Sequence, residues 1–323
     1  MRALLIHLGC LLSLLIASAA SAVTMDWTPI GDPGNACDPQ TPGCFGAVGY
    51  AYNIGTYEVT NAQYAEFLNA KAKSDPLGLY NANMGSGPAS PYYGGIARSG
   101  DSGTYTYTAV SGRENMPVNW VSFYDALRFA NWMNNGQGGG DTESGAYTIT
   151  IEGINDNTIA RNSGATIFLA SENEWYKAAY YDAASASYFV YPTASDAPTT
   201  CATPTSAANQ ANCGGAVGNL TIRGRYTGSA SPYGTFDQAG NVTEWTEGVA
   251  GDGAERAIRG GAYGDAYYQL ASWTRWGLYP GSSGPTEGFR LAMIPEPGTG
   301  LLMIAGLLGL TGWRRIARSR MRP

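Results

Sequence analysis

Histidine is almost absent from this 323-residue sequence, which contains only His7. Charged residues make up just 14% of the chain, and no cysteine follows Cys213. Histidine is the most frequent general base and metal ligand in proteins. Serine–histidine hydrolysis and iron held by two histidines and a carboxylate are therefore excluded for the chain beyond residue 7.

Glycine and tyrosine are abundant instead, with 44 and 22 residues. The glycines follow no Gly-X-Y period, which excludes a collagen-like chain. An aromatic content of 12% is too high for a disordered chain. We find no repeat of fixed period and no clear linker, and the length suffices for a sizeable core. The simplest organisation is one irregular domain over residues 26–294.

Residues 1–22 are predicted to be a secretory signal peptide. Arg2 provides the positive start, an apolar stretch follows, and the small residues Ala-Ser-Ala end at Ala22. The alternative is a buried N-terminal helix. Cleavage after Ala22 would remove both His7 and Cys10, so that the mature protein would contain no histidine.

The other end, residues 295–323, has three parts. Pro-Glu-Pro at 295–297 precedes an apolar run over 299–313, and five arginines follow between 314 and 322. Such arginines hold the end of a chain on the cytoplasmic side of a membrane. The run is shorter than the roughly 20 residues of a full span, which favours a temporary anchor helix over a permanent one.

This tail resembles a PEP-CTERM sorting signal of exported Gram-negative bacterial proteins. The resemblance implies recognition by the membrane enzyme exosortase and a location in the cell envelope, at the cell surface or outside the cell. An ordinary single-pass anchor is the alternative, with the same topology and no processing.

Removal of both ends changes the charge balance. Residues 23–294 keep 13 Lys and Arg against 24 Asp and Glu, a net charge of −11 where the whole chain has −6. Such a surface repels the phosphates of nucleic acids, so we expect no nucleic-acid partner. Divalent cations and neutral partners fit it better.

The remaining cysteines form two close pairs in the sequence, Cys37 with Cys44 and Cys201 with Cys213. Each pair closes a short loop, and an exported chain meets an oxidising compartment, so two disulfides are expected. Free thiols and a metal site are the alternatives, although the spacing is not that of zinc ligands.

Three helix starts share one capping pattern, in which a Ser or Thr side chain and a polar side chain three residues later satisfy free backbone N–H groups. The three pairs are Thr60 with Gln63, Ser122 with Asp125, and Ser171 with Glu174. The second helix also carries an apolar stripe over residues 126–133.

Short strands are expected in the segments YNIGTYEV, AYTITI, ATIFLA, NVTEWT, AIRGGAY and GFRLAMI. Long stretches rich in Gly, Ser, Asn and Pro join them. We interpret residues 155–157, Asn-Asp-Asn, as a hairpin turn between two strands.

The ordered segments IGTYEVTNAQYAEF, MPVNWVSFYDALRFANW, LASENEWYKAAYY, YGTFDQAGNVTEW, AIRGGAY and EGFRLAM resemble the sulfatase-modifying factor family. That family includes the formylglycine-generating enzymes. The segments span about residues 48–294. The resemblance implies an α+β fold, a variant of the C-type lectin fold with little regular secondary structure.

The sequence lacks the catalytic residues that the resemblance would imply. Formylglycine-generating enzymes bind copper with two cysteines after the Arg-Gly-Gly segment, and those positions correspond approximately to Asp265 and Leu270 here. Neither side chain offers the soft ligand that Cu(I) requires. Iron-dependent sulfoxide synthases of the same superfamily use histidines, which are missing. We therefore expect no catalysis, with a formylglycine-type oxidase or another enzyme of unrecognised chemistry as the alternative.

A structural calcium site is implied by the family's Gly-Asn-x-x-Glu-Trp segment. The ligands would be the carboxylates of Asp237 and Glu244 and the main-chain carbonyls of Gly240 and Val242, all oxygen donors that calcium accepts. The alternative is that Asp237 caps a turn and Glu244 is a solvated strand residue. A second site near residues 209–219 cannot be given ligands.

Tyrosines in the glycine-rich loops suggest sugar binding, because aromatic faces stack on sugars. They are Tyr92, Tyr93, Tyr105, Tyr107, Tyr267 and Tyr268. The alternative is packing of loops that have little other structure. The sequence thus predicts an exported, non-catalytic binding or structural module of the cell surface or extracellular matrix, with an exopolysaccharide or other glycan as a candidate ligand.

Overall fold

The computed structural model describes residues 22–87 and 94–295. The predicted signal peptide up to residue 21, the predicted sorting segment from residue 296, and Tyr92 and Tyr93 lie outside these ranges. Within the described ranges, no helix is long and apolar enough to cross a membrane.

Regular secondary structure is sparse, as the α+β prediction expects, and the longest helix within the described ranges has 12 residues. The α-helices are α1 (Asn61–Lys71), α2 (Phe123–Asn134), α3 (Ile151–Asn155) and α4 (Glu172–Tyr180). Two short 3-10 helices are η1 (Ala82–Gly85) and η2 (Tyr267–Leu270).

Two four-stranded sheets organise the described chain. The first has the order β1 (Trp27–Ile30), β4 (Tyr52–Gly55), β16 (Leu291–Met293) and β7 (Ile167–Leu169), with antiparallel neighbours. The second has the order β14 (Trp276–Leu278), β13 (Glu255–Arg259), β12 (Thr243–Ala250) and β15 (Glu287–Phe289). In the second sheet β12 and β15 are parallel.

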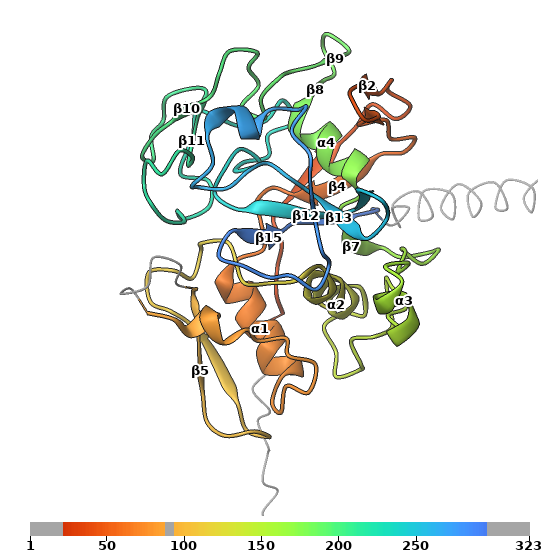
Figure 1. Cartoon of the computed structure of the whole chain (residues 1–323), viewed down its shortest axis with the longest axis vertical. Helices are drawn as coiled ribbons and strands as arrows, with labels where there is room; N and C mark the ends of the chain where they lie inside the picture. The colour runs from red at the N-terminus through yellow and green to blue at the C-terminus, as the bar shows by residue number, and fades with distance from the viewer. Residues whose placement is uncertain (1–21, 88–93, 296–323) are drawn as a thin grey trace, which may run out of the picture.

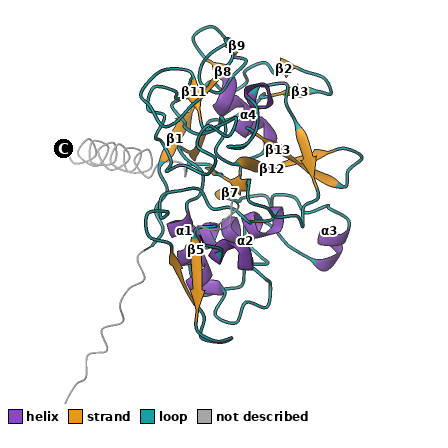
Figure 2. Ribbon diagram, turned by 60° about the vertical axis from the view of Figure 1, so that its left-hand side comes forward, coloured by secondary structure: helices purple, strands orange, loops and turns teal. Residues whose placement is uncertain are grey.

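The described chain also contains four two-stranded ribbons outside these two sheets. They are β2 (Asp38–Pro39) with β3 (Cys44–Phe45), β5 (Ile96–Ser99) with β6 (Thr106–Ala109), β8 (Tyr181–Asp182) with β9 (Ser187–Tyr188), and β10 (Thr200–Cys201) with β11 (Gln210–Ala211). Figures 1 and 2 show α4 on one side of β12 and β13, with α1 and α2 on the opposite side.

The three predicted helix starts are confirmed. Thr60, Ser122 and Ser171 are the N-caps of α1, α2 and α4, and each forms the complete reciprocal capping box with the residue three positions later. The apolar stripe of α2 is buried along its whole length. These local signals need no tertiary context, which is why the sequence reveals them.

Aromatic side chains fill the space between the helices and the second sheet. Phe129 of α2 stacks against Tyr64 of α1 at 5.9 Å between ring centroids and meets Phe289 of β15 edge-on at 5.5 Å. Trp245 of β12 is fully buried and donates a hydrogen bond to the carbonyl of Val121 at 3.0 Å. Such aromatic pairs contribute both buried area and directional contacts to the core.

Both predicted disulfides are present. Cys37 is bonded to Cys44 with a Cα–Cα distance of 5.4 Å, and Cys201 to Cys213 with 4.7 Å. They tie down the β2–β3 ribbon and the loop that contains β10 and β11. Paired cysteines of this kind are consistent with an exported or extracellular protein.

The predicted hairpin around residues 155–157 is wrong. The segment AYTITI forms only an isolated bridge from Tyr147 to Arg161, and then Thr150 caps the short helix α3. The Asn131 side chain occupies the place of a partner strand, since its amide donates to the Tyr147 carbonyl at 3.0 Å and accepts from the Tyr147 N–H at 2.7 Å. A side chain that satisfies the backbone in this way removes the need for a ladder.

Candidate functional site

The predicted calcium ligands lie around the start of β12. Asp237 has a left-handed backbone (φ 60°), and its buried carboxylate accepts a hydrogen bond from the Gly224 N–H at 2.5 Å. Burial raises the pKa of Asp237 to about 6. Gly240 also has a positive φ, 79°, and a Cβ there would collide with the carbonyl of Asn212. The local backbone therefore requires glycine at that position.

Glu244 is fully buried, so its alternative interpretation as a solvated strand residue is wrong. Both carboxylate oxygens are bound by the guanidinium of Arg290, at 2.6 and 2.7 Å, and Trp175 Nε1 donates to one of them at 2.8 Å. Arg290 itself has no exposed surface. It is the single residue between β15 and β16, so this ion pair joins the two sheets where the chain passes from one to the other.

A further buried carboxylate, Glu58, lies in the same neighbourhood. Burial raises its pKa well above the usual range, and the negative charge of Asp237 adds to the effect. Glu58 Oε1 accepts a hydrogen bond from Asn241 at 3.3 Å, whereas Oε2 is buried with no hydrogen-bond partner. The sequence does not single out Glu58, because nothing near it in the sequence distinguishes it from an exposed glutamate.

The predicted calcium ligands differ in how many of their oxygen atoms are free to bind an ion. Asp237 has one carboxylate oxygen in a hydrogen bond, while both oxygens of Glu244 are occupied by Arg290. Val242 is buried and packs against Leu220 and Tyr263. Among the described residues, no group of three or more His, Cys, Asp and Glu side chains is arranged to hold a metal ion. Asp237 and main-chain carbonyls thus suit calcium better than Glu244 does.

The positions that correspond to the family's copper ligands have structural roles. The carboxylate of Asp265 accepts a hydrogen bond from the Ala262 N–H at 2.9 Å, and Leu270 is fully buried. The cysteines in the described ranges are all paired in disulfides, so this part of the chain offers no thiol.

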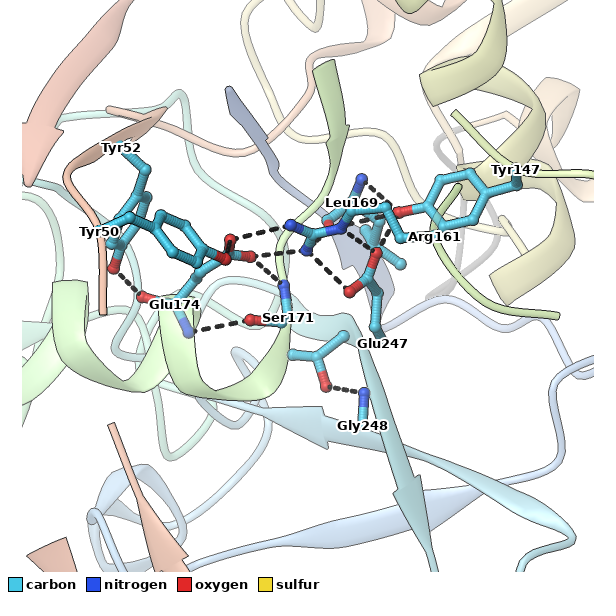
Figure 3. Close-up of polar contacts among 10 residues, drawn as sticks. Tyr50, Tyr52, Tyr147, Arg161, Leu169, Ser171, Glu174, Glu247 and Gly248 are labelled. Carbon is cyan, nitrogen blue, oxygen red and sulfur yellow. Dashed lines mark hydrogen bonds and ion pairs between the residues drawn. The ribbon is translucent and has the colours of Figure 1, made fainter. Parts of the chain in front are cut away.

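Arg161 lies at the centre of a polar network with two carboxylates and two tyrosines (Figure 3). Arg161 Nη2 contacts Glu174 at 2.8 Å and Glu247 at 2.7 Å. Tyr50 donates to Glu174 at 2.6 Å, and Tyr147 donates to Glu247. The network connects the start of α4, the strand β12 and the segment before β7.

The two carboxylates of this network have opposite pKa shifts. Burial raises the pKa of Glu247, because its contacts with Arg161 and Tyr147 offset only part of the cost of desolvation. Burial also acts to raise the pKa of Glu174, but the hydrogen bonds and charge of Arg161 dominate and lower it. A pair with opposite shifts is a pattern found in acid–base catalysis. The Glu174 side chain has no exposed surface, whereas Glu247 keeps 18% of its side-chain surface exposed.

The exposed aromatic residues concentrate in one segment, residues 267–279. Their exposed fractions are 43% for Tyr267, 56% for Tyr268, 52% for Trp273, 50% for Trp276 and 62% for Tyr279. The only other aromatic side chain among the large exposed hydrophobic residues of the described chain is Tyr50. We call residues 267–279 the aromatic segment. Tyr267 and Tyr268 were predicted from the sequence as candidates for sugar binding, whereas the exposure of Trp273, Trp276 and Tyr279 was missed.

The other tyrosines singled out in the sequence serve packing. Tyr107 is buried and donates a hydrogen bond to the Ala72 carbonyl at 2.7 Å. Tyr105 is half-buried and lies under the guanidinium of Arg98, 4.4 Å from the ring centroid. Tyr105 and Tyr107 therefore pack the loops together, which is the alternative to sugar binding that the sequence leaves open.

Residues beneath the surface hold the aromatic segment in place. Arg275 donates to Glu172 at 2.7 and 2.8 Å and to the Val249 carbonyl at 2.7 Å. Trp273 lies edge-on to the buried Tyr191, with 6.4 Å between ring centroids. These contacts fix the chain just before Trp276, and Trp276 itself pairs with Ile258 of β13, so the middle of the segment has a rigid support.

A comparison with protein-family models decides the family. The model of the sulfatase-modifying factor enzyme 1-like domain matches residues 38–294. The chain belongs to this family. A comparison with curated protein sequences gives no significant match.

Solved structures share the fold of this sulfatase-modifying factor domain. Treponema denticola variable protein 1 is 20% identical, with a TM-score of 0.56, over 86% of this chain and 98% of that one. The crystal structure of CarF is 21% identical, with a TM-score of 0.55, over 84% of this chain and 99% of that one. At these identities the likeness concerns the fold alone.

Proposed function

We propose that this protein is an exported, non-catalytic binding module of the cell surface or extracellular matrix, and that it binds a glycan. The observation that carries this proposal is the concentration of exposed aromatic side chains in residues 267–279. Soluble proteins bury most of their large aromatic rings, and contiguous exposed apolar surface marks a site of interaction.

The aromatic segment supplies what glycan recognition needs. Exposed Trp and Tyr rings present flat apolar faces together with polar edges, which suits the alternating C–H and hydroxyl surfaces of a sugar. Because Arg275 and Glu172 hold the backbone, little conformational entropy would be lost on binding.

Export and sorting form a separate part of the proposal. Residues 1–22 would direct secretion, and residues 295–323 would anchor the protein through a short membrane helix until an exosortase-type enzyme acts on it. The two disulfides support an oxidising destination.

Calcium is proposed as a structural ion at the predicted site. Asp237 would supply a carboxylate oxygen, and Gly240 and Val242 would supply carbonyl oxygens. Glu244 is predicted as the fourth ligand, but both of its carboxylate oxygens bind Arg290. Its contribution to the site would therefore include holding the start of β12 in place through that ion pair. When bound, the ion would neutralise negative charge in a buried region, and it has no part in any reaction.

The glycan proposal is tested with the full-length chain purified in mild detergent. On a glycan array, we expect binding by the wild-type protein and at least about tenfold weaker binding after Trp273→Ala/Trp276→Ala, equivalent to about 1.4 kcal/mol. Leu77→Ala removes an exposed apolar side chain outside the segment and should leave binding unchanged. Equal binding by the double variant and the wild type would contradict the proposal.

The alternative function, a formylglycine-type oxidase, is tested with the same preparation. The protein is incubated with copper, oxygen and a Cys-x-Pro-x-Arg peptide, and the peptide is analysed by mass spectrometry. We expect no aldehyde, because the described part of the chain offers no thiol for copper. Turnover would overturn the non-catalytic assignment.

A further inference from the structure

A wide cleft of about 680 Å³ lies at the end of the aromatic segment. Three separate parts of the chain form its walls: residues 154–157 at the end of α3, residues 252–254 between β12 and β13, and residues 279–281. Tyr124 of α2 also lines the cleft. Both cartoon views place α3 beside α2 at one side of the molecule (Figures 1 and 2).

The walls of the cleft are cross-linked by hydrogen bonds. Arg256 donates from Nε to the Asn157 side chain at 2.6 Å and from Nη2 to the Asn157 carbonyl at 2.9 Å. The Asn157 amide in turn donates to the carbonyl of Gly253 at 2.9 Å. Arg256 is buried, so its charge is used to brace the structure and is not offered to a ligand. The cleft is thus preformed, which lowers the entropic cost of binding.

Several polar groups along the walls have no partner in the described parts of the chain. The side chains of Asn155 and Asp156 are exposed and make no hydrogen bond there. Asp252 accepts one weak hydrogen bond from the Ala254 N–H at 3.3 Å. Tyr279, 62% exposed, leaves both its ring and its hydroxyl free.

The charges that line the cleft are all negative, which favours some ligands over others. Its lining contains two carboxylates, Asp156 and Asp252, and no Lys, Arg or His. An acidic ligand would be repelled, because like charges at short range are unfavourable. Carboxylates accept strong, charge-assisted hydrogen bonds from hydroxyl groups. Tyr279 offers an apolar face for stacking.

We infer that this cleft binds a neutral, hydroxyl-rich glycan chain and excludes acidic polysaccharides. The inference rests on the proposed glycan-binding function and adds the chemical class of the ligand. Tyr279 belongs both to the aromatic segment and to the cleft, so a glycan held among Asn155, Asp156 and Asp252 would also contact an exposed ring of that segment.

The test measures the dissociation constants of the full-length chain for three soluble polymers. These are a neutral β-glucan, alginate as the uronate polymer, and chitosan oligomers as the amine polymer. We expect binding to the β-glucan and none to alginate at low ionic strength. The D156N/D252N variant should bind the β-glucan about tenfold more weakly, because its side chains lose the charge that strengthens the hydrogen bonds.

Controls separate this inference from the wider proposal. Asp101→Asn removes an exposed carboxylate away from the cleft and should leave the affinity for β-glucan unchanged. If D156N/D252N binds like the wild type while Trp273→Ala/Trp276→Ala binds weakly, glycan binding stands and the cleft assignment falls. Equal affinity for alginate, or stronger and salt-sensitive binding to chitosan, would overturn the neutral class. No binding to any polymer would overturn both proposals.

Discussion

At the scale of single residues, the described chain uses its few cations mainly inside the structure. Arg256, Arg259 and Arg290 are all buried and bonded to carboxylates, amides or carbonyls. Buried ionic groups require such complete pairing, because removal from water costs several kcal/mol for each ion. The consequence is an outer surface whose remaining charges are mostly acidic.

The Glu244–Arg290 pair permits a residue-scale prediction. Arg290→Met should lower the free energy of unfolding by about 3–5 kcal/mol, because it leaves a buried carboxylate without its partner. The double variant Glu244→Gln/Arg290→Met should recover part of that loss, since no unpaired charge remains. Urea denaturation measures both values. A loss below about 1 kcal/mol in the single variant would contradict the assigned role.

Asp125 permits a prediction of pH dependence. Burial raises the pKa of this carboxyl to about 6, above the value of about 3.9 in an unfolded chain. The folded state therefore holds the proton more tightly, and this contribution to stability is present below about pH 4 and lost as the pH rises through 6.

Asp125→Asn removes this titration. Between pH 4 and 7, the stability of the wild type should fall by about 2–3 kcal/mol relative to the variant. Urea denaturation over that range measures the difference. Parallel stability curves for the two proteins would show that the buried carboxyl does not titrate as described.

At the scale of elements, α4 depends on its first turn. Ser171 accepts from the Glu174 N–H, and the Ser171 N–H donates to the Glu174 carboxylate, which also binds Arg161. The cap of the helix and the charge network are thus one structure. Loss of the cap should loosen both.

Ser171→Ala should lower the free energy of unfolding by about 1 kcal/mol, the usual cost of an N-cap. Ser171→Asn is the matched control, because its side-chain oxygen can still accept the hydrogen bond. Thermal and urea unfolding would both report the difference. Equal losses in the two variants would attribute the effect to packing and not to the cap.

At the scale of the whole molecule, the proposed calcium ion should stabilise the fold. Because an ion that binds only the folded state adds about 2.7 kcal/mol at 100 times its Kd, chelation should lower the Tm by several degrees. Asp237→Asn should reduce this response. The measurement combines metal analysis with melting curves, with and without chelator. No bound calcium and an unchanged Tm would contradict the site.

The sequence predicts the parts of this molecule that are encoded locally. The caps at Thr60, Ser122 and Ser171 each lie within four residues, and each disulfide joins cysteines only 7 or 12 positions apart. Family resemblance supplied the fold, because the distinctive segments extend over most of the chain. What failed was the hairpin near residues 155–157, where Asn131, a distant side chain, took the place of a strand.

The candidate site could not be predicted in the same way. Trp175 and Trp276 are chemically identical, yet one is fully buried and the other is half-exposed. The pairing of Glu244 with Arg290 joins residues 46 positions apart. Exposure and long-range pairing depend on how the sheets and loops pack, so they become visible only in three dimensions.

The position of β16 has a mechanical consequence. This strand lies between β4 and β7 and ends at Met293, two residues before the predicted sorting segment begins. If that segment is held in a membrane, any pull on it would load an interior strand of the first sheet directly. A cut near residue 297 would instead release a folded domain with only a short stub.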